Sequence, residues 1–306
     1  MPKITALALL PLTCAVFSAA EDPTTADTPA QMIVTVGHHY GRVLPVLTKD
    51  DLTVTQQYQP RAVTNLTPLR GSRADLELFV LVDHCSNCEA GSQFEELSHF
   101  IGSQPASTKI GIAYIQNGRL QVAENPTADR ARAVNALNTP QGSKPASPFH
   151  ALTDLIRSWP RATARRVVLM VSNGINPDAA DRLQDPSAEE ALATAQRAGV
   201  TLYVIYHPSA DYVETDASKL DTGQVQLAHV ADETGGEAYF LGFGPLPSLA
   251  PFLTDLADHL ANQYLLEFRA EGIGALQTVT VKSRITDLEV MAPDKVFVPG
   301  AAPATK

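Results

Sequence analysis

We predict an α/β fold with a doubly wound, mostly parallel sheet, from two observations on the sequence. Three apolar runs, 75–83, 165–174 and 200–207, are near-continuous, as strands buried on both faces are. Helical segments separate such runs, for example 91–103, where Phe94, Leu97, Phe100 and Ile101 recur at helical spacing. Strands that alternate with helices of this length predict a mostly parallel, doubly wound sheet, whose functional site lies at the carboxyl ends of the central strands.

The remaining elements follow from local turn and cap signals. Asn117-Gly118 joins the strands 108–115 and 119–124 into a hairpin. Helices are predicted over 127–137 with a Thr cap, over 147–159 with Ser147 before Pro148, and over 187–199 with Gly199 at the carboxyl end. We further expect a helix over 225–236, a short strand over 237–242, a helix over 246–263 and antiparallel strands over 264–270, 275–284 and 287–293.

The two ends of the chain differ in composition from its middle. Residues 1–20 have one Lys, an apolar stretch and a small-residue site at Ala20, which predicts a signal peptide. Short β-branched segments broken by Gly and Pro predict a small β module near the N-terminus. The expected organisation is a signal peptide (1–20), a flexible lead (21–30), the β module (31–70), the α/β domain (75–262), a C-terminal β hairpin region that packs with the β module (263–292) and a flexible tail (293–306).

Charge and hydropathy exclude two classes of partner. The formal net charge of −10 argues against nucleic acid, because phosphate binding needs clustered Lys and Arg. After residue 20, no apolar stretch approaches the ~18 residues of a membrane span, so we expect no stable membrane anchor. Together with the predicted signal peptide (1–20), this indicates a secreted or periplasmic protein.

The segment "FVLVDHCSNCEAG" (79–91) places Cys85 and Cys88 directly after a predicted strand. In an exported protein, such a close pair is more often a disulfide than a metal site. Thiol–disulfide exchange is an alternative, because a helix N-terminus stabilises a thiolate, but Glu89 and the acids that follow act in the opposite direction. A zinc site would need two further ligands, for which His84 and His150 are the candidates.

Signatures of enzymes are missing from the sequence. No G-x-S-x-G nucleophile motif and no H-E-x-x-H pattern occurs, and the "GFGPLP" run (242–247) lacks the spacing of a nucleotide-binding loop. We therefore expect a protein that is not an enzyme.

Five segments, in order, resemble one family. They are "VLTKDDLTVTQQYQPRAVTNLTP", "LFVLVDHCSN", "RRVVLMVSNG", "LAHVADETGGEAYF" and "LANQYLLEFRA" followed by "VTVKSR". Together they are similar to the von Willebrand factor A (VWA)-related proteins of the acidobacterial exported type. The resemblance covers nearly the whole chain after residue 20.

The resemblance implies a metal-ion-dependent adhesion site (MIDAS), built from D-x-S-x-S on one loop, a Thr on a second and an Asp on a third. The matching positions here are Asp83, Cys85, Asn87, Ser147 and Asn173. One of two carboxylates remains, and sulfur replaces a hydroxyl oxygen, which suits Mg²⁺ poorly. We expect no cofactor beyond weak Mg²⁺ or Ca²⁺ binding through Asp83.

These expectations combine into a secreted, non-enzymatic binding module with a degenerate MIDAS. Its partner would be a protein or an extracellular polymer, bound at a face formed by residues 83–88, 145–150 and 173–178. Two alternatives stay open: an exported thiol–disulfide oxidoreductase that uses Cys85 and Cys88, and a VWA domain that retains weak cation-dependent binding.

Overall fold

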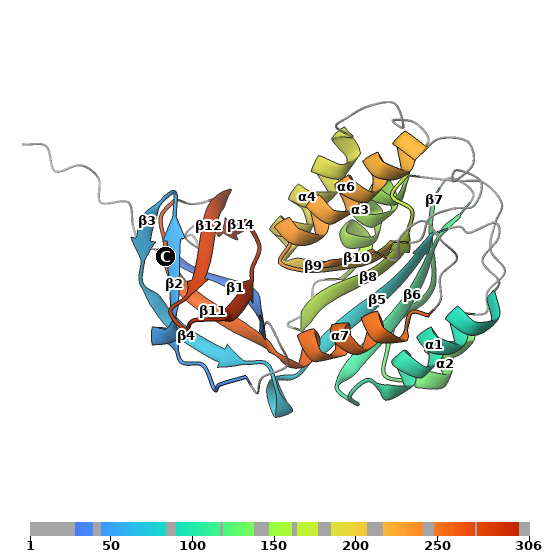
Figure 1. Ribbon diagram of the computed structural model, residues 1–306, viewed down its shortest axis with the longest axis horizontal. Helices are drawn as coiled ribbons and strands as arrows, with labels where there is room; N and C mark the ends of the chain where they lie inside the picture. Colours follow the sequence, from blue (N-terminus) through green and yellow to red (C-terminus); the bar gives the residue numbers. More distant parts are fainter. Residues whose placement is uncertain are drawn as a thin grey trace, which may run out of the picture.

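A computed structural model of the 306-residue chain shows an α/β unit beside a β-sandwich (Figure 1). The structure describes residues 28–38, 44–83, 90–116, 119–137, 147–160, 164–176, 185–206, 217–240, 248–272 and 274–299. The expected signal peptide and residues 21–27 of the expected lead lie outside the described residues. Within those residues, no helix has the length and apolarity needed to cross a membrane.

The α/β unit is built on a six-stranded sheet with the strand order β10-β9-β8-β5-β6-β7. The strands are β5 (Leu76–Asp83), β6 (Thr108–Gln116), β7 (Arg119–Thr127), β8 (Arg165–Ser172), β9 (Val200–Tyr206) and β10 (Ala238–Phe240). All neighbours pair in parallel except β6 and β7, which form the predicted hairpin with Gln116 opposite Arg119. The predicted doubly wound, mostly parallel sheet is confirmed.

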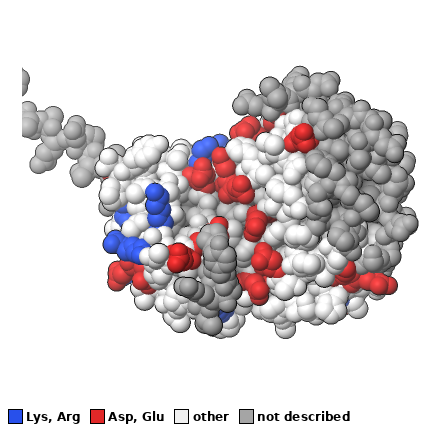
Figure 2. All heavy atoms as spheres, viewed as in Figure 1, with Lys and Arg blue, Asp and Glu red and all other residues white. Residues whose placement is uncertain are grey.

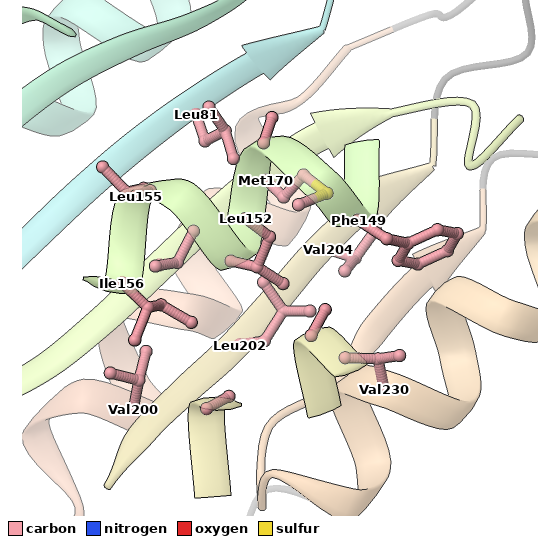
Figure 3. Close-up of a cluster of buried hydrophobic side chains, with 14 of the residues drawn as sticks. Leu81, Phe149, Leu152, Leu155, Ile156, Met170, Val200, Leu202, Val204 and Val230 are labelled. Atoms are coloured by element: carbon pink, nitrogen blue, oxygen red, sulfur yellow. The ribbon is translucent and has the colours of Figure 1, made fainter. Parts of the chain in front are cut away.

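Helices cover both faces of this sheet, as Figure 1 shows. They are α1 (Ala90–Ser103), α2 (Arg130–Ala136), α3 (Pro148–Ser158), α4 (Pro186–Ala198), α6 (Ala217–Glu233) and α7 (Ala250–Ala261). One core lies between the sheet and α3, α4 and α6, where Leu81 and Met170 of the strands pack with Leu152 of α3 (Figure 3). A second core lies on the opposite face, against α1, α2 and α7. Burial on both faces explains why these strands are continuously apolar.

The caps of the helices follow local sequence signals, with one correction. Ser147 caps α3 through its side chain, and Gly199 ends α4 with a left-handed backbone (φ 63°), as predicted. The predicted Thr cap of the helix 127–137 was wrong. The N-cap of α2 is Asp129, whose side chain accepts a hydrogen bond from the Arg132 backbone, because the helix starts only at Arg130.

The chain before β5 and the chain after α7 form the β-sandwich together. One sheet has the order β13-β1-β11-β4 and the other the order β14-β12-β2-β3. The strands are β1 (Thr28–His38), β2 (Leu52–Gln56), β3 (Gln59–Arg61), β4 (Val63–Pro68), β11 (Gln263–Ala270), β12 (Ala275–Ser283), β13 (Leu288–Met291) and β14 (Lys295–Val298), with short 3₁₀ turns at Lys49–Asp51 and Gly71–Arg73. A single core joins their apolar side chains.

Three details of this sandwich differ from the sequence-based expectations. Strand β1 begins at Thr28, inside the expected lead, because the whole of β1 pairs with β11 or β13. Strand β14 lies inside the expected tail, because Val296 and Val298 are buried and β14 pairs with β12. The final strands are antiparallel, but β11 and β12 pair with N-terminal strands of different sheets rather than with each other.

The "TGG" segment links α6 to β10 through close backbone contacts. Thr234 Oγ1 accepts a hydrogen bond from the Leu202 backbone N–H at 3.0 Å and donates one to the Ala231 carbonyl at 2.8 Å. A Cβ atom at Gly236 would lie 1.9 Å from the Leu202 carbonyl oxygen, so only glycine fits there. The segment therefore holds the start of β10 against β9.

Candidate functional site

The carboxyl ends of β5 and β8 bring Asp83 beside Ser172. The two strands pair in parallel with Val82 opposite Val171, so the residues that follow lie next to each other. Ser172 donates its hydroxyl to Asp83 Oδ2 at 2.6 Å, and both side chains are buried. The short bond is typical of a hydroxyl that donates to a carboxylate. Asp83 therefore has a donor from a neighbouring strand.

Asn173 follows Ser172 in a tight turn that uses its side chain. The Asn173 Oδ1 atom accepts a hydrogen bond from the Ile175 backbone N–H at 2.9 Å, and Ser172 Oγ accepts one from the Gly174 backbone N–H at 3.0 Å. Gly174 has a φ of +71°, and a Cβ atom there would lie 2.3 Å from the Gly223 carbonyl oxygen of α6. The amide oxygen at the third expected ligand position is thus engaged within its own loop.

Ser147, the expected second-loop ligand, is buried at the start of α3. Its Oγ atom accepts a hydrogen bond from the His150 backbone N–H at 3.3 Å, which makes Ser147 the N-cap. The same Oγ lies 3.4 Å from Ser187 Oγ of α4. The Ser147 hydroxyl thus meets a second hydroxyl at the tip of α4.

Ser147 belongs to a buried network with Asn176, which lies in the predicted face 173–178, and with Asp185 and Ser187, which sequence reasoning missed. Asp185 Oδ1 accepts hydrogen bonds from the backbone and the hydroxyl of Ser187 at 2.8 and 2.7 Å. Asp185 Oδ2 accepts one from Asn176 Nδ2 at 2.7 Å, and the same amide lies 3.2 Å from Ser187 Oγ. Asp185 is the N-cap of α4, and Pro186 follows it, as Pro148 follows Ser147. That repeated cap signal in the sequence could have identified Asp185.

The other predicted site residues cannot be compared with the structure. Cys85, Asn87 and Cys88 lie outside the described residues, and so does His84. The expected Cys85–Cys88 disulfide therefore stays a prediction. Of the expected ligand set, the structure places Asp83 and Asn173 on the adjacent ends of β5 and β8, and Ser147 in the α3–α4 network.

Two aromatic side chains lie at the same edge of the sheet, at the ends of β9 and β10. Tyr206 is buried, and burial, together with the nearby charge of Asp221, raises its pKa to about 12. Phe240 packs against it with ring centroids 6.1 Å apart and remains 41% exposed. Exposed aromatic side chains are common anchors of protein interfaces. The edge therefore combines hydrogen-bonded polar side chains with one exposed aromatic side chain, Phe240.

In the described part of this edge, hydrogen bonds within the protein engage both the carboxylates and the hydroxyls. Each of the two carboxylates, Asp83 and Asp185, already accepts hydrogen bonds from protein donors, which a hard cation would have to replace. The Ser147 hydroxyl lies 3.4 Å from the Ser187 hydroxyl. These hydrogen bonds hold the ends of β5 and β8 and the starts of α3 and α4 in place.

Comparison with solved structures returned matches at low sequence identity. Proximal thread matrix protein 1 from the mussel byssus, with a zinc-occupied MIDAS motif, is 13% identical over 62% of this chain, with a TM-score of 0.44. That match spans 46% of the mussel protein's chain. A von Willebrand factor type A protein from Catenulispora acidiphila is 8% identical, with a TM-score of 0.44, over 90% of this chain and 75% of its own.

A third match is the vWF domain of the type V pili tip protein Mfa5 from Porphyromonas gingivalis. It is 10% identical, with a TM-score of 0.44, over 60% of this chain and 93% of its own. No protein-family model and no curated protein matches the sequence. The fold class stated above rests on the sheet topology of the chain itself.

Proposed function

We propose that the chain is a secreted, non-enzymatic, VWA-like binding module with a degenerate MIDAS, whose partner is a protein or an extracellular polymer. The five sequence segments that resemble VWA-related proteins support the family assignment. The partner would be bound at the carboxyl edge of the sheet, where parallel α/β folds carry their sites.

The hydrogen bond that Asn173 accepts, together with its lack of charge, is the observation that best supports a degenerate site. A carboxylate at this position would supply the second negative charge that a hard divalent cation requires. Asn173 has no charge, and its Oδ1 atom accepts a hydrogen bond from the Ile175 backbone. Asp83 is therefore left as the one carboxylate among the described members of the expected ligand set, and it is bound to Ser172.

Calorimetric titration with Mg²⁺, Mn²⁺ and Ca²⁺ tests the degenerate site. We expect none of these ions to bind at the carboxyl edge of the wild-type protein with sub-millimolar affinity. The variant Asn173→Asp should bind Mg²⁺ at least tenfold more tightly, because it restores the missing carboxylate. The control Asn135→Asp adds the same charge on the exposed face of α2 and should change nothing. Sub-millimolar binding by the wild type that Asp83→Ala abolishes would overturn the proposal.

The partner surface can be tested separately from the cation. We expect capture of extracellular proteins or polymers from the native secreted fraction to be equal with and without a chelator. Phe240→Ser should reduce this capture, because Phe240 is 41% exposed at the proposed face. Phe297→Ser is the matched control, since Phe297 is 37% exposed but lies on β14 of the sandwich. Equal loss with both variants would argue against this face.

A further inference from the structure

A second cluster of metal-ligating side chains lies on the α/β unit, away from the carboxyl edge. It consists of Glu237, just before β10, and Asp255 and His259, one turn apart on α7. Their ligand atoms all lie within 4.8 Å of one another, and no other such group occurs among the described residues. This cluster has no role in the proposed binding function.

The two carboxylates converge on one nitrogen of the histidine. His259 Nδ1 lies 3.5 Å from Glu237 Oε2 and 3.6 Å from Asp255 Oδ2. Two atoms bonded to one tetrahedral Zn²⁺ at about 2.0–2.1 Å lie about 3.3–3.4 Å apart. The observed separations need only a small adjustment of the side chains to accept an ion.

The positions of the neighbouring groups hold the histidine in this orientation. Its ring packs beside the buried Tyr203 ring, with centroids 6.0 Å apart, and its side chain is 14% exposed. A Cβ atom at Gly37 of β1 would lie 3.9 Å from His259 Nε2, so this nitrogen faces the sandwich. The Tyr239 hydroxyl donates to Asp255 Oδ2 at 2.8 Å and lies 3.4 Å from His259 Nδ1. Such outer partners orient the ligands of protein metal sites.

Acidic groups surround Glu237. Burial raises the pKa of Glu237 to about 7, and each charged neighbour that adds to this shift is itself an acid: Asp255, Glu289 and Asp232. In the part of the chain that the structure describes, the ion pairs of Lys and Arg involve other acids. Figure 2 shows acidic side chains gathered where the α/β unit meets the sandwich. A bound divalent cation would relieve this repulsion.

We propose that Glu237, Asp255 and His259 form a binding site for Zn²⁺ at the junction of the α/β unit and the β-sandwich. The imidazole nitrogen selects a borderline ion over Ca²⁺ and Mg²⁺, which prefer all-oxygen sites. Glu237 and Asp255 are 40% and 50% exposed, so the ion can enter from solvent, and water completes its coordination.

Zinc titration of the purified, chelator-stripped protein tests this site. We expect one Zn²⁺ per chain, and a loss of affinity of at least tenfold in His259→Gln and in Glu237→Gln. His229→Gln is the matched control. His229 also lies near two glutamates, but it uses Nε2 toward Glu189 at 3.3 Å and Nδ1 toward Glu233 at 3.5 Å, so the two carboxylates do not converge on one nitrogen.

Three results would overturn the proposal. The first is zinc binding by the wild type that is no stronger than by His259→Gln. The second is binding that survives His259→Gln but is lost in Cys85→Ser with Cys88→Ser, or in Asp83→Ala, which would place the ion at the other edge. The third is Ca²⁺ or Mg²⁺ binding at this cluster as tight as that of Zn²⁺.

Thermal unfolding provides a second measurement that separates binding from folding. Zinc should raise the melting temperature of the wild type and of His229→Gln, because a ligand that binds only the folded state stabilises it. The melting temperature of His259→Gln should not respond to zinc, although its circular dichroism spectrum matches the wild type. A zinc response in His259→Gln as large as in the wild type contradicts the site.

Discussion

The two acidic regions of the α/β unit handle negative charge in opposite ways. At the carboxyl edge, Asp83 and Asp185 are buried and receive hydrogen bonds from hydroxyl, amide or backbone donors. At the junction with the sandwich, Glu237 and Asp255 are half-exposed, and the groups that press on Glu237 are further acids. The carboxylates at the edge are therefore satisfied by hydrogen bonds within the protein, whereas the junction keeps negative charge that a cation would neutralise.

The largest expected effect is at the carboxyl edge, in Asp185→Ala. This change removes a buried carboxylate that accepts three hydrogen bonds, leaves the Asn176 amide and the Ser187 groups without that partner, and removes the N-cap of α4. We expect a loss of about 3 kcal/mol in the free energy of unfolding, measured by denaturant titration. Asp129→Ala, which removes the exposed cap of α2, should cost about 1 kcal/mol. Equal costs would contradict the buried network.

The next effect is expected for Ser172→Ala at the same edge. The substitution removes the donor to Asp83 and the acceptor of the Gly174 backbone N–H. We expect chemical denaturation to show a loss of about 2 kcal/mol, since a bond to a buried carboxylate is lost. Ser158→Ala is the control, because the Ser158 hydroxyl donates only to a carbonyl of its own helix, and it should cost less than about 0.5 kcal/mol. A cost below the control would mean that Asp83 does not depend on Ser172.

At the junction, removal of an acid should raise the free energy of unfolding instead of lowering it. In chelator at about pH 8, Glu237→Gln should be more stable than the wild type by on the order of 1 kcal/mol, because it relieves repulsion from Asp255 and Glu289 and the cost of burial. Glu190→Gln is the control, since Glu190 pairs with Arg157 on the surface, and it should give no gain. If Glu237→Gln is destabilised as strongly as Asp185→Ala, the contrast between the two regions is wrong.

The smallest effect is expected in the sandwich, where an arginine neutralises an acid. Arg61 Nη1 lies 2.5 Å from Glu271 Oε1. The hydrogen bond from Arg61 holds the pKa of Glu271 below that of an unperturbed glutamate. The pair therefore adds stability at pH values above the unperturbed pKa, and the contribution is lost as the pH falls through the lowered pKa. Glu271→Gln should be slightly less stable than the wild type at about pH 6, and the difference should shrink toward about pH 3 in acid titrations. A difference that grows at low pH would contradict the assignment.

Much of the fold could be predicted because it depends on local patterns. Continuous apolar runs identified β5, β8 and β9, and the Ser147-Pro148 and Gly199 signals identified the start of α3 and the end of α4. The limits of the sandwich could not be predicted in the same way. Thr28 belongs to a strand because it pairs with Ala270 of β11, at the other end of the chain, and Val296 belongs to one because it pairs with Gln277 of β12.

The candidate site was predictable only where a motif marks it. Asp83 and Asn173 lie at strand ends and could be found from the sequence. Asp185 and Ser187 were missed, because the cap signal at Asp185 indicates only a helix start and says nothing of the contacts with Ser147 and Asn176. The cluster of Glu237 with Asp255 and His259 was missed as well. Glu237 and Asp255 are 18 residues apart, and neither this spacing nor the position of His259 matches a known metal-ligand motif.

The fold class, the places where strands give way to loops, and the presence of an amide at position 173 all follow from the sequence alone. These properties depend on hydrophobic periodicity, turn chemistry and the identity of single residues. Which polar groups meet depends on the tertiary structure: Ser172 donates a hydrogen bond to Asp83, and Glu237 and His259 lie together at the junction. The reason is that hydrogen bonding and charge compensation depend on distances between segments, which strand pairing and helix packing set.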